Sequence, residues 1–112
     1  MFAEYVDEFE KLAREHGKHT SKYLVKFGTP LWITNGDDNA GIYALCTPLP
    51  ERNEIVVDRE KWDNLSRQCR RALIFHEAGH CGLGKFHAPG IMRSILNCEA
   101  VDDPKEVEKL FE

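Results

Sequence analysis

One short stretch, residues 75–92, constrains the fold of this chain more than any other. It reads FHEAGHCGLGKFHAPGIM and contains His76, Glu77, His80 and His87. On an α-helix, residues four apart project from the same face, so His76 and His80 are expected about one turn apart. Two imidazoles placed in this way can bind one zinc ion, with Glu77 within reach of a water molecule on it. The apolar run ALIF precedes the stretch, which predicts a partly buried helix rather than a solvated one.

A zinc site needs a third protein ligand, and a catalytic site leaves the fourth position for water. We expect His87 to be this ligand, because Gly82 and Gly84 allow the chain to reverse after the helix. Glu99, in the segment NCEAVDD, is the alternative third ligand, and otherwise a solvated carboxylate. The residues alone leave both ligands open. The spacing from His80 to Glu99 is short for a glutamate ligand on a second helix, which favours His87.

The chemistry expected of such a site is hydrolysis. A zinc ion lowers the pKa of its water toward neutrality and polarises a substrate carbonyl. Glu77 is then the expected general base and acid, which takes the proton from water and passes it to the leaving amine.

Apolar periodicity divides the rest of the chain into an α+β pattern with its strands in the first half. An amphipathic helix is expected over residues 2–16, with Gly17 as its C-terminal cap. Short apolar runs bounded by turn residues predict four strands, at 22–27, 30–34, 42–46 and 54–58.

Two further helices are expected in the second half. The main one covers residues 63–84, with Asp63 as its N-cap and Ser66 in its first turn. After an irregular segment, a last helix is expected within residues 101–112. Asp103 can cap it, Pro104 suits its first position, and Glu106 completes a capping box.

Length and charge limit the class of protein. The chain has 112 residues and a net charge of −4, so we expect a single domain over residues 1–112 that does not bind nucleic acid. No run of apolar residues is long enough to cross a membrane. The acidic N-terminal segment does not resemble a signal peptide, which favours a cytoplasmic location, with a leader removed beforehand as the alternative. We expect a monomer.

Four cysteines are present, at positions 46, 69, 81 and 98. An even number permits two disulfides, but no signal peptide and no CxxC pair support that interpretation. The sequence therefore favours reduced, mostly buried thiols. Cys81, which directly follows His80, is expected in the core.

The stretch also resembles a known family. The metzincin zinc peptidases carry H-E-x-x-H-x-x-G-x-x-H followed by a methionine turn. This pattern fits His76, Glu77, His80, Gly84 and His87 if one residue is inserted. APGIMRS is similar to the methionine turn, and its methionine is Met92. NEIVVDREKW and VDDPKEVEKLF are similar to segments of the matrixin-like branch, so the resemblance covers roughly residues 54–111.

The resemblance implies a small zincin-like domain, in which a mixed sheet of three to four strands packs on an active-site helix flanked by N-terminal and C-terminal helices. It implies a zinc metallopeptidase with His76, His80 and His87 as metal ligands and Met92 beneath the metal. The partner would be a peptide or protein substrate, and the segment 40–46 is the candidate edge strand for pairing with it; otherwise this segment is an inner strand.

Two other classes of function remain open. The small size of the chain favours a metal-binding module with little turnover that acts by binding or inhibition, whereas the intact Glu77 favours an enzyme. A metal-free interaction domain is the third class.

Overall fold

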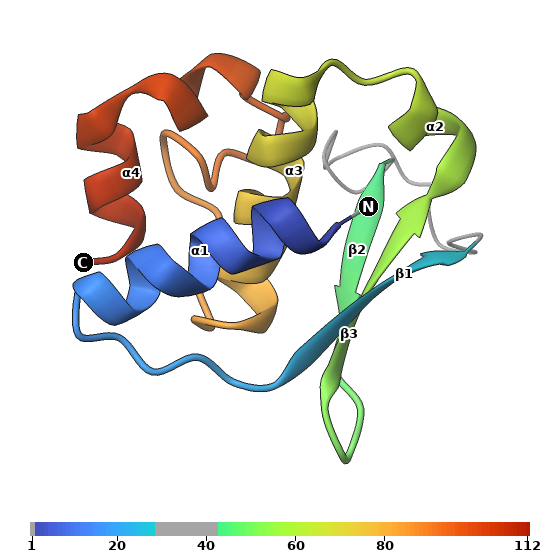
Figure 1. Cartoon of the computed structure of the whole chain (residues 1–112), viewed down its shortest axis with the longest axis horizontal. Coiled ribbons are helices and arrows are strands. Elements are labelled where there is room, and N and C mark those ends of the chain that lie inside the picture. The colour runs from blue at the N-terminus through green and yellow to red at the C-terminus, as the bar shows by residue number, and fades with distance from the viewer. Residues whose placement is uncertain (1, 29–42) are drawn as a thin grey trace.

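Helix α3 (Arg67–Cys81) runs through the centre of the molecule and carries the HEAGH stretch. The computed structural model describes residues 2–28 and 43–112. The sheet lies on one side of α3 and α4 (Pro104–Leu110) on the other (Figure 1). Because it is covered on several sides, α3 is buried without interruption over residues 72–79. Polar side chains buried in the middle of such a helix are costly unless they are hydrogen-bonded or paired.

The sheet has three strands among the described residues: β1 (Tyr23–Gly28), β2 (Ala44–Thr47) and β3 (Asn53–Asp58). Their order is β1-β3-β2, with β1 parallel and β2 antiparallel to β3. The central strand β3 buries three successive residues, whereas β1 alternates half-buried with exposed positions. The predicted α+β class and small mixed sheet are confirmed, and the strand predicted at 30–34 lies outside the described residues.

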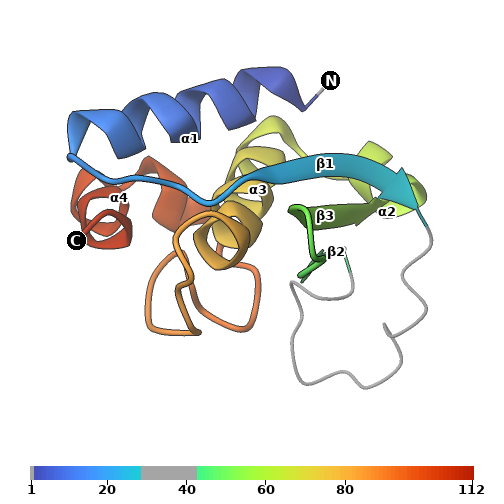
Figure 2. The same cartoon turned by 90° about the horizontal axis from the view of Figure 1, so that it is seen from below.

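Helix α1 (Ala3–Glu15) packs against α3 through aromatic side chains. Phe9 is fully buried, and its ring lies 5.6 Å from that of Phe75 on α3. Figure 2 shows α1 on one side of α3 and the segment that follows α3 on the opposite side. Gly17 ends α1 as predicted: at φ +68° it lets Lys18 N–H donate to the carbonyl of Ala13.

The start of the main helix was predicted wrongly. Ser66, not Asp63, is the N-cap of α3, and its hydroxyl accepts from Cys69 N–H. Asp63 instead ends a separate short helix, α2 (Arg59–Asp63). This helix exists because Asp58 caps it and because Trp62 is buried in the core. The burial of Trp62 depends on the tertiary structure, so the local pattern did not reveal the break.

A 3₁₀ helix, η2 (Cys98–Asp102), precedes α4 in what the sequence presented as an irregular segment. Asp103 caps α4 and Pro104 occupies its first position, both as predicted. The other contact of the predicted capping box, between Asp103 N–H and the Glu106 side chain, is wrong. Asp103 N–H donates to the carbonyl of Ala100, and Glu106 instead pairs with Lys109 at 3.2 Å.

The cysteines form two disulfides, Cys46–Cys81 and Cys69–Cys98, so the prediction of reduced thiols is wrong. The partners lie 35 and 29 residues apart, and only the fold brings them together. Cys81 is buried, as expected. Both disulfides attach to α3, one near each end, and fix it to β2 and to η2. Among the described residues, no helix combines the length and apolar character needed to span a membrane.

Candidate metal centre

The structure brings His76, His80 and His87 together. One ring nitrogen from each lies within 4.8 Å of the others. The Nε2 atoms of His76 and His80 are 3.2 Å apart. Two nitrogens bound tetrahedrally to one zinc ion at 2.0–2.1 Å would be separated by roughly 3.3 Å. The spacing of these two nitrogens therefore fits one shared metal ion.

The second nitrogen of two of these rings is held by the main chain. Nδ1 of His76 lies 2.8 Å from the carbonyl oxygen of Ile91, and Nδ1 of His80 lies 2.7 Å from that of Lys85. A carbonyl oxygen only accepts, so Nδ1 carries the proton in both rings. Each Nε2 then presents a lone pair toward the other imidazoles, which is the tautomer a metal requires.

The turn after α3 accommodates the extra residue before His87. Gly84 adopts φ +68°, and its N–H donates to the carbonyl of His80. Lys85 N–H returns to the carbonyl of Gly79, so the chain reverses within a few residues. His87 reaches the other two imidazoles from this reversed segment. It is exposed, whereas His76 is fully buried, so the group opens to solvent on the side of His87.

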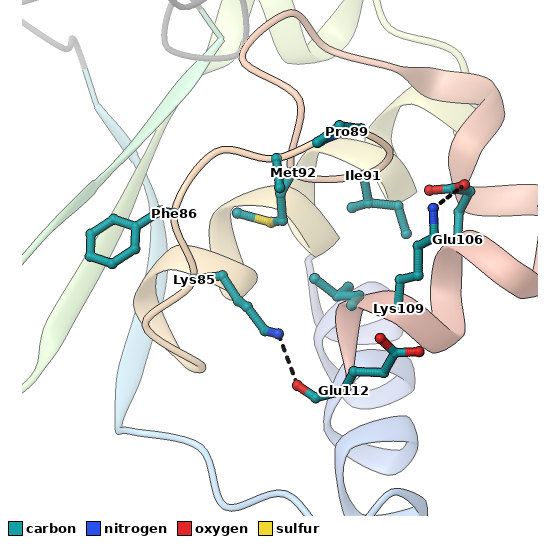
Figure 3. A pocket seen from close by; sticks show the side chains of 10 residues that line it. Lys85, Phe86, Pro89, Ile91, Met92, Glu106, Lys109 and Glu112 are labelled. Carbon is teal, nitrogen blue, oxygen red and sulfur yellow. Dashed lines mark hydrogen bonds and ion pairs between the residues drawn. The ribbon is translucent and has the colours of Figure 1, made fainter.

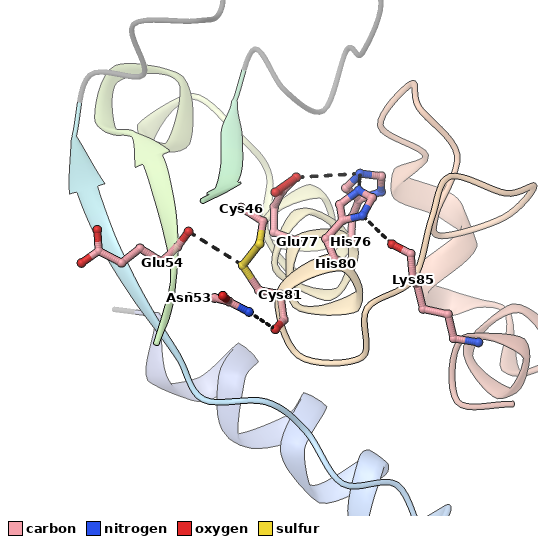
Figure 4. Close-up of a disulfide and its surroundings, with 8 residues drawn as sticks. All are labelled: Cys46, Asn53, Glu54, His76, Glu77, His80, Cys81 and Lys85. Atoms are coloured by element: carbon pink, nitrogen blue, oxygen red, sulfur yellow. Dashed lines mark hydrogen bonds and ion pairs between the residues drawn. A yellow bond between two sulfur atoms is a disulfide. The ribbon is translucent and has the colours of Figure 1, made fainter. Parts of the chain in front are cut away.

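Glu77 lies beside the histidine group. Its side chain is 1% exposed, and Oε1 is 3.8 Å from Nε2 of His76. Figure 4 shows Glu77 and His76 side by side on α3, joined by this contact. Glu99, the alternative ligand, is exposed on η2 and is not part of the group that the described residues form.

Met92 packs under the histidine-bearing helix. It is buried, and its thioether contacts α3 where Gly79 has no side chain. The turn that carries it is closed by a hydrogen bond from Arg93 N–H to the carbonyl of Gly90. Ile91, in the same turn, supplies the carbonyl that orients His76. The turn thus packs a side chain against α3 and orients one ring of the group.

Replacing Gly79 with alanine is expected to destabilise the fold by about 1–3 kcal/mol, the usual range for overpacking a core. The new Cβ would lie 2.5 Å from Sδ of Met92 and 3.2 Å from a methyl group of Leu110. Urea denaturation measures the effect. In the double variant Gly79→Ala/Met92→Ala the loss should be smaller than the sum of the two single losses. Additive losses would contradict the contact.

The disulfide between Cys46 and Cys81 lies at the end of α3, one residue beyond His80 (Figure 4). Next to it, the side-chain amide of Asn53 donates to the carbonyl of Cys81 at 2.8 Å. Both contacts attach this end of the helix to the sheet. Sequence reasoning missed them, and only the even number of cysteines hinted at the disulfide.

The strand predicted to bind a peptide corresponds to β2, which the structure describes from Ala44 onward. Among the described strands, β2 pairs with β3 alone. The prediction of an edge strand and the alternative of an inner strand both stay predictions, and so does peptide binding at this segment.

Two depressions flank the segment that follows α3. One, of about 300 Å³, lies between this segment and α4 and has an apolar floor with lysines and glutamates at its rim (Figure 3). It includes none of the three histidines. The other, of about 460 Å³, is lined by residues 87–90 together with Arg93, Ser94 and Asn97. Because His87 belongs to its wall, the second depression adjoins the candidate metal centre.

No family model, curated protein or solved structure matches the chain significantly. The interpretation of the site therefore depends on its own geometry.

Proposed function

We propose that this chain is a zinc-dependent peptidase with a zincin-like fold. The observation that carries the proposal is the pair of Nε2 atoms 3.2 Å apart, each on a ring whose Nδ1 proton is held by a carbonyl. This tautomer and spacing suit zinc. His76, His80 and His87 would hold the ion, and Met92 would form the floor of the site.

When bound, zinc supplies Lewis-acid polarisation of a carbonyl and an acidified water molecule. The contribution of the chain is to place a proton carrier and to orient the substrate. Glu77 is next to His76, where its carboxylate can accept a proton and later deliver it to the leaving amine nitrogen. The exposed side at His87 offers room for an extended peptide, and so does β2, which pairs with β3 alone among the described strands.

A metal-binding module without turnover is the second candidate. The observation in its favour is the small sheet, which has three strands among the described residues and so offers little surface to a substrate. Glu77, 1% exposed beside the histidines, favours the enzyme, because a module that only binds metal needs no proton carrier at that place.

We propose that the protein is a monomer that acts in an oxidising compartment. Disulfides persist mainly in such compartments, and the two disulfides favour this location over the cytoplasm expected from the sequence.

Replacing Glu77 with glutamine tests the function. We expect the variant to keep one zinc ion per chain and to lose about 10²–10⁴-fold in peptide hydrolysis, the usual contribution of a general acid–base group. Metal analysis and cleavage of unfolded casein measure the two properties. Glu60→Gln, at an exposed position on α2, is the matched control and should retain activity.

Three results would contradict the proposal in whole or in part. If the wild type binds zinc but cleaves neither casein nor a peptide library, the module without turnover replaces the enzyme. Equal activity of wild type and Glu77→Gln would remove Glu77 from the mechanism. If the protein holds no zinc and a chelator leaves its melting temperature unchanged, the metal-free domain replaces both.

A further inference from the structure

The depression beside His87 has an unusual charge for this protein. The chain carries 19 acidic and 15 basic residues, yet no carboxylate lines this depression. Its one permanently charged lining residue is Arg93. By contrast, the pocket next to α4 balances Lys85 and Lys109 with two glutamates, so it has no preference for one sign of charge (Figure 3).

Arg93 is exposed, and it belongs to none of the ion pairs or cation–π contacts found among the described residues. Other arginines are already engaged: Arg67 and Arg71 pair with glutamates of α1, and Arg59 and Arg70 lie over aromatic rings. A planar guanidinium offers a fork of donors that matches a carboxylate. Ser94 and Asn97, in the same wall, add a hydroxyl and an amide that can also donate.

The backbone fixes Arg93 relative to the candidate metal centre. Arg93 N–H donates to the carbonyl of Gly90, and Ala88 N–H to that of Met92. These bonds close the turn whose Ile91 carbonyl holds His76. Arg93 and His87 therefore line one depression from a single hydrogen-bonded segment.

We propose that this depression binds a carboxylate of the peptide substrate through Arg93. The inference rests on the proposed function and adds a substrate class to it, namely peptides with a carboxylate close to the scissile bond. That carboxylate comes either from an aspartate or glutamate side chain or from the free C-terminus. The positive charge of a metal ion next to His87 would add to the attraction.

Binding to the zinc-loaded Glu77→Gln protein tests the proposal without turnover. The probes are fluorescein-labelled alanine-based decapeptides that carry one glutamate at each position in turn, and matched peptides with glutamine. Each is made with a free and with an amidated C-terminus. Fluorescence anisotropy should show about tenfold tighter binding for at least one carboxylate-bearing peptide than for its neutral partner. The difference should shrink as salt is raised.

Substitution of Arg93 tests whether this residue causes the difference in affinity between charged and neutral peptides. Arg93→Gln should bring the charged and neutral peptides to equal affinity, and Arg93→Lys should keep part of the difference, because the charge stays but the fork is lost. Arg14→Gln removes the same charge from an exposed position on α1 and should keep the full difference in affinity. A preference that depends on glutamate identifies a side chain as the source, and one that depends on the free C-terminus identifies the α-carboxylate.

Equal affinity for all peptides, absence of binding, or a preference that survives Arg93→Gln would overturn the inference. Its failure is distinguishable from failure of the proposed function. Zinc content and casein cleavage can both be normal while the carboxylate preference is missing. Conversely, the preference can be present in a protein that binds zinc but does not cleave.

Discussion

Replacing His76 with alanine is expected to lower the affinity for zinc about a thousandfold. Its imidazole is fully buried and fixed by the carbonyl of Ile91, so no neighbouring group can take its place easily. Zinc sites in small proteins bind with about 12 kcal/mol, and one third of that, about 4 kcal/mol, corresponds to roughly a thousandfold. Competition with a chromophoric chelator measures the change. His19→Ala, at an exposed position, should have no effect.

The same titration decides between the two candidate third ligands. His87→Ala should weaken zinc binding strongly, although less than His76→Ala, because His87 is exposed and water can replace it. Glu99→Gln should leave the affinity unchanged. Loss of zinc on Glu99→Gln would exchange the two assignments, and full zinc affinity in His76→Ala would contradict the metal centre altogether.

Removing the disulfide between Cys46 and Cys81, by alanine at both positions, is expected to destabilise the protein by about 3–4 kcal/mol. This is the loop-closure contribution for partners 35 residues apart. The melting temperature should fall by roughly 13–17 °C, as measured by circular dichroism. Zinc affinity should fall as well, because the disulfide holds the end of α3 that carries His80.

The second disulfide provides the matched control. Cys69 and Cys98 lie 29 residues apart, so replacing both with alanine should destabilise the fold by a similar amount. This disulfide joins the start of α3 to η2, far along the helix from His80. Zinc affinity at a temperature where both variants are folded should therefore stay close to that of the wild type. An equal loss of zinc affinity in the two variants would show that the first disulfide has no specific effect on the metal centre.

The local part of the fold could be predicted because its causes lie close together in the sequence. Gly17 ends α1 through backbone conformation, and Asp103 with Pro104 starts α4 through capping. Short apolar runs bounded by turn residues were enough to predict β1 and β3. The break between α2 and α3 was not predictable in this way, since it depends on the burial of Trp62 against other parts of the chain.

The candidate site, too, has one part that follows from local sequence and another that depends on tertiary packing. The sequence by itself determined that His76 and His80 share a helix face beside Glu77, because helical geometry sets that relation. Only the tertiary structure decided the tautomers of the two rings, through the carbonyls of Ile91 and Lys85, and delivered His87 across the turn at Gly84. It also decided the pairing of the cysteines and the position of Arg93 next to His87. These features join residues that are distant in the sequence or depend on the path of a reversed segment, and only packing brings them together.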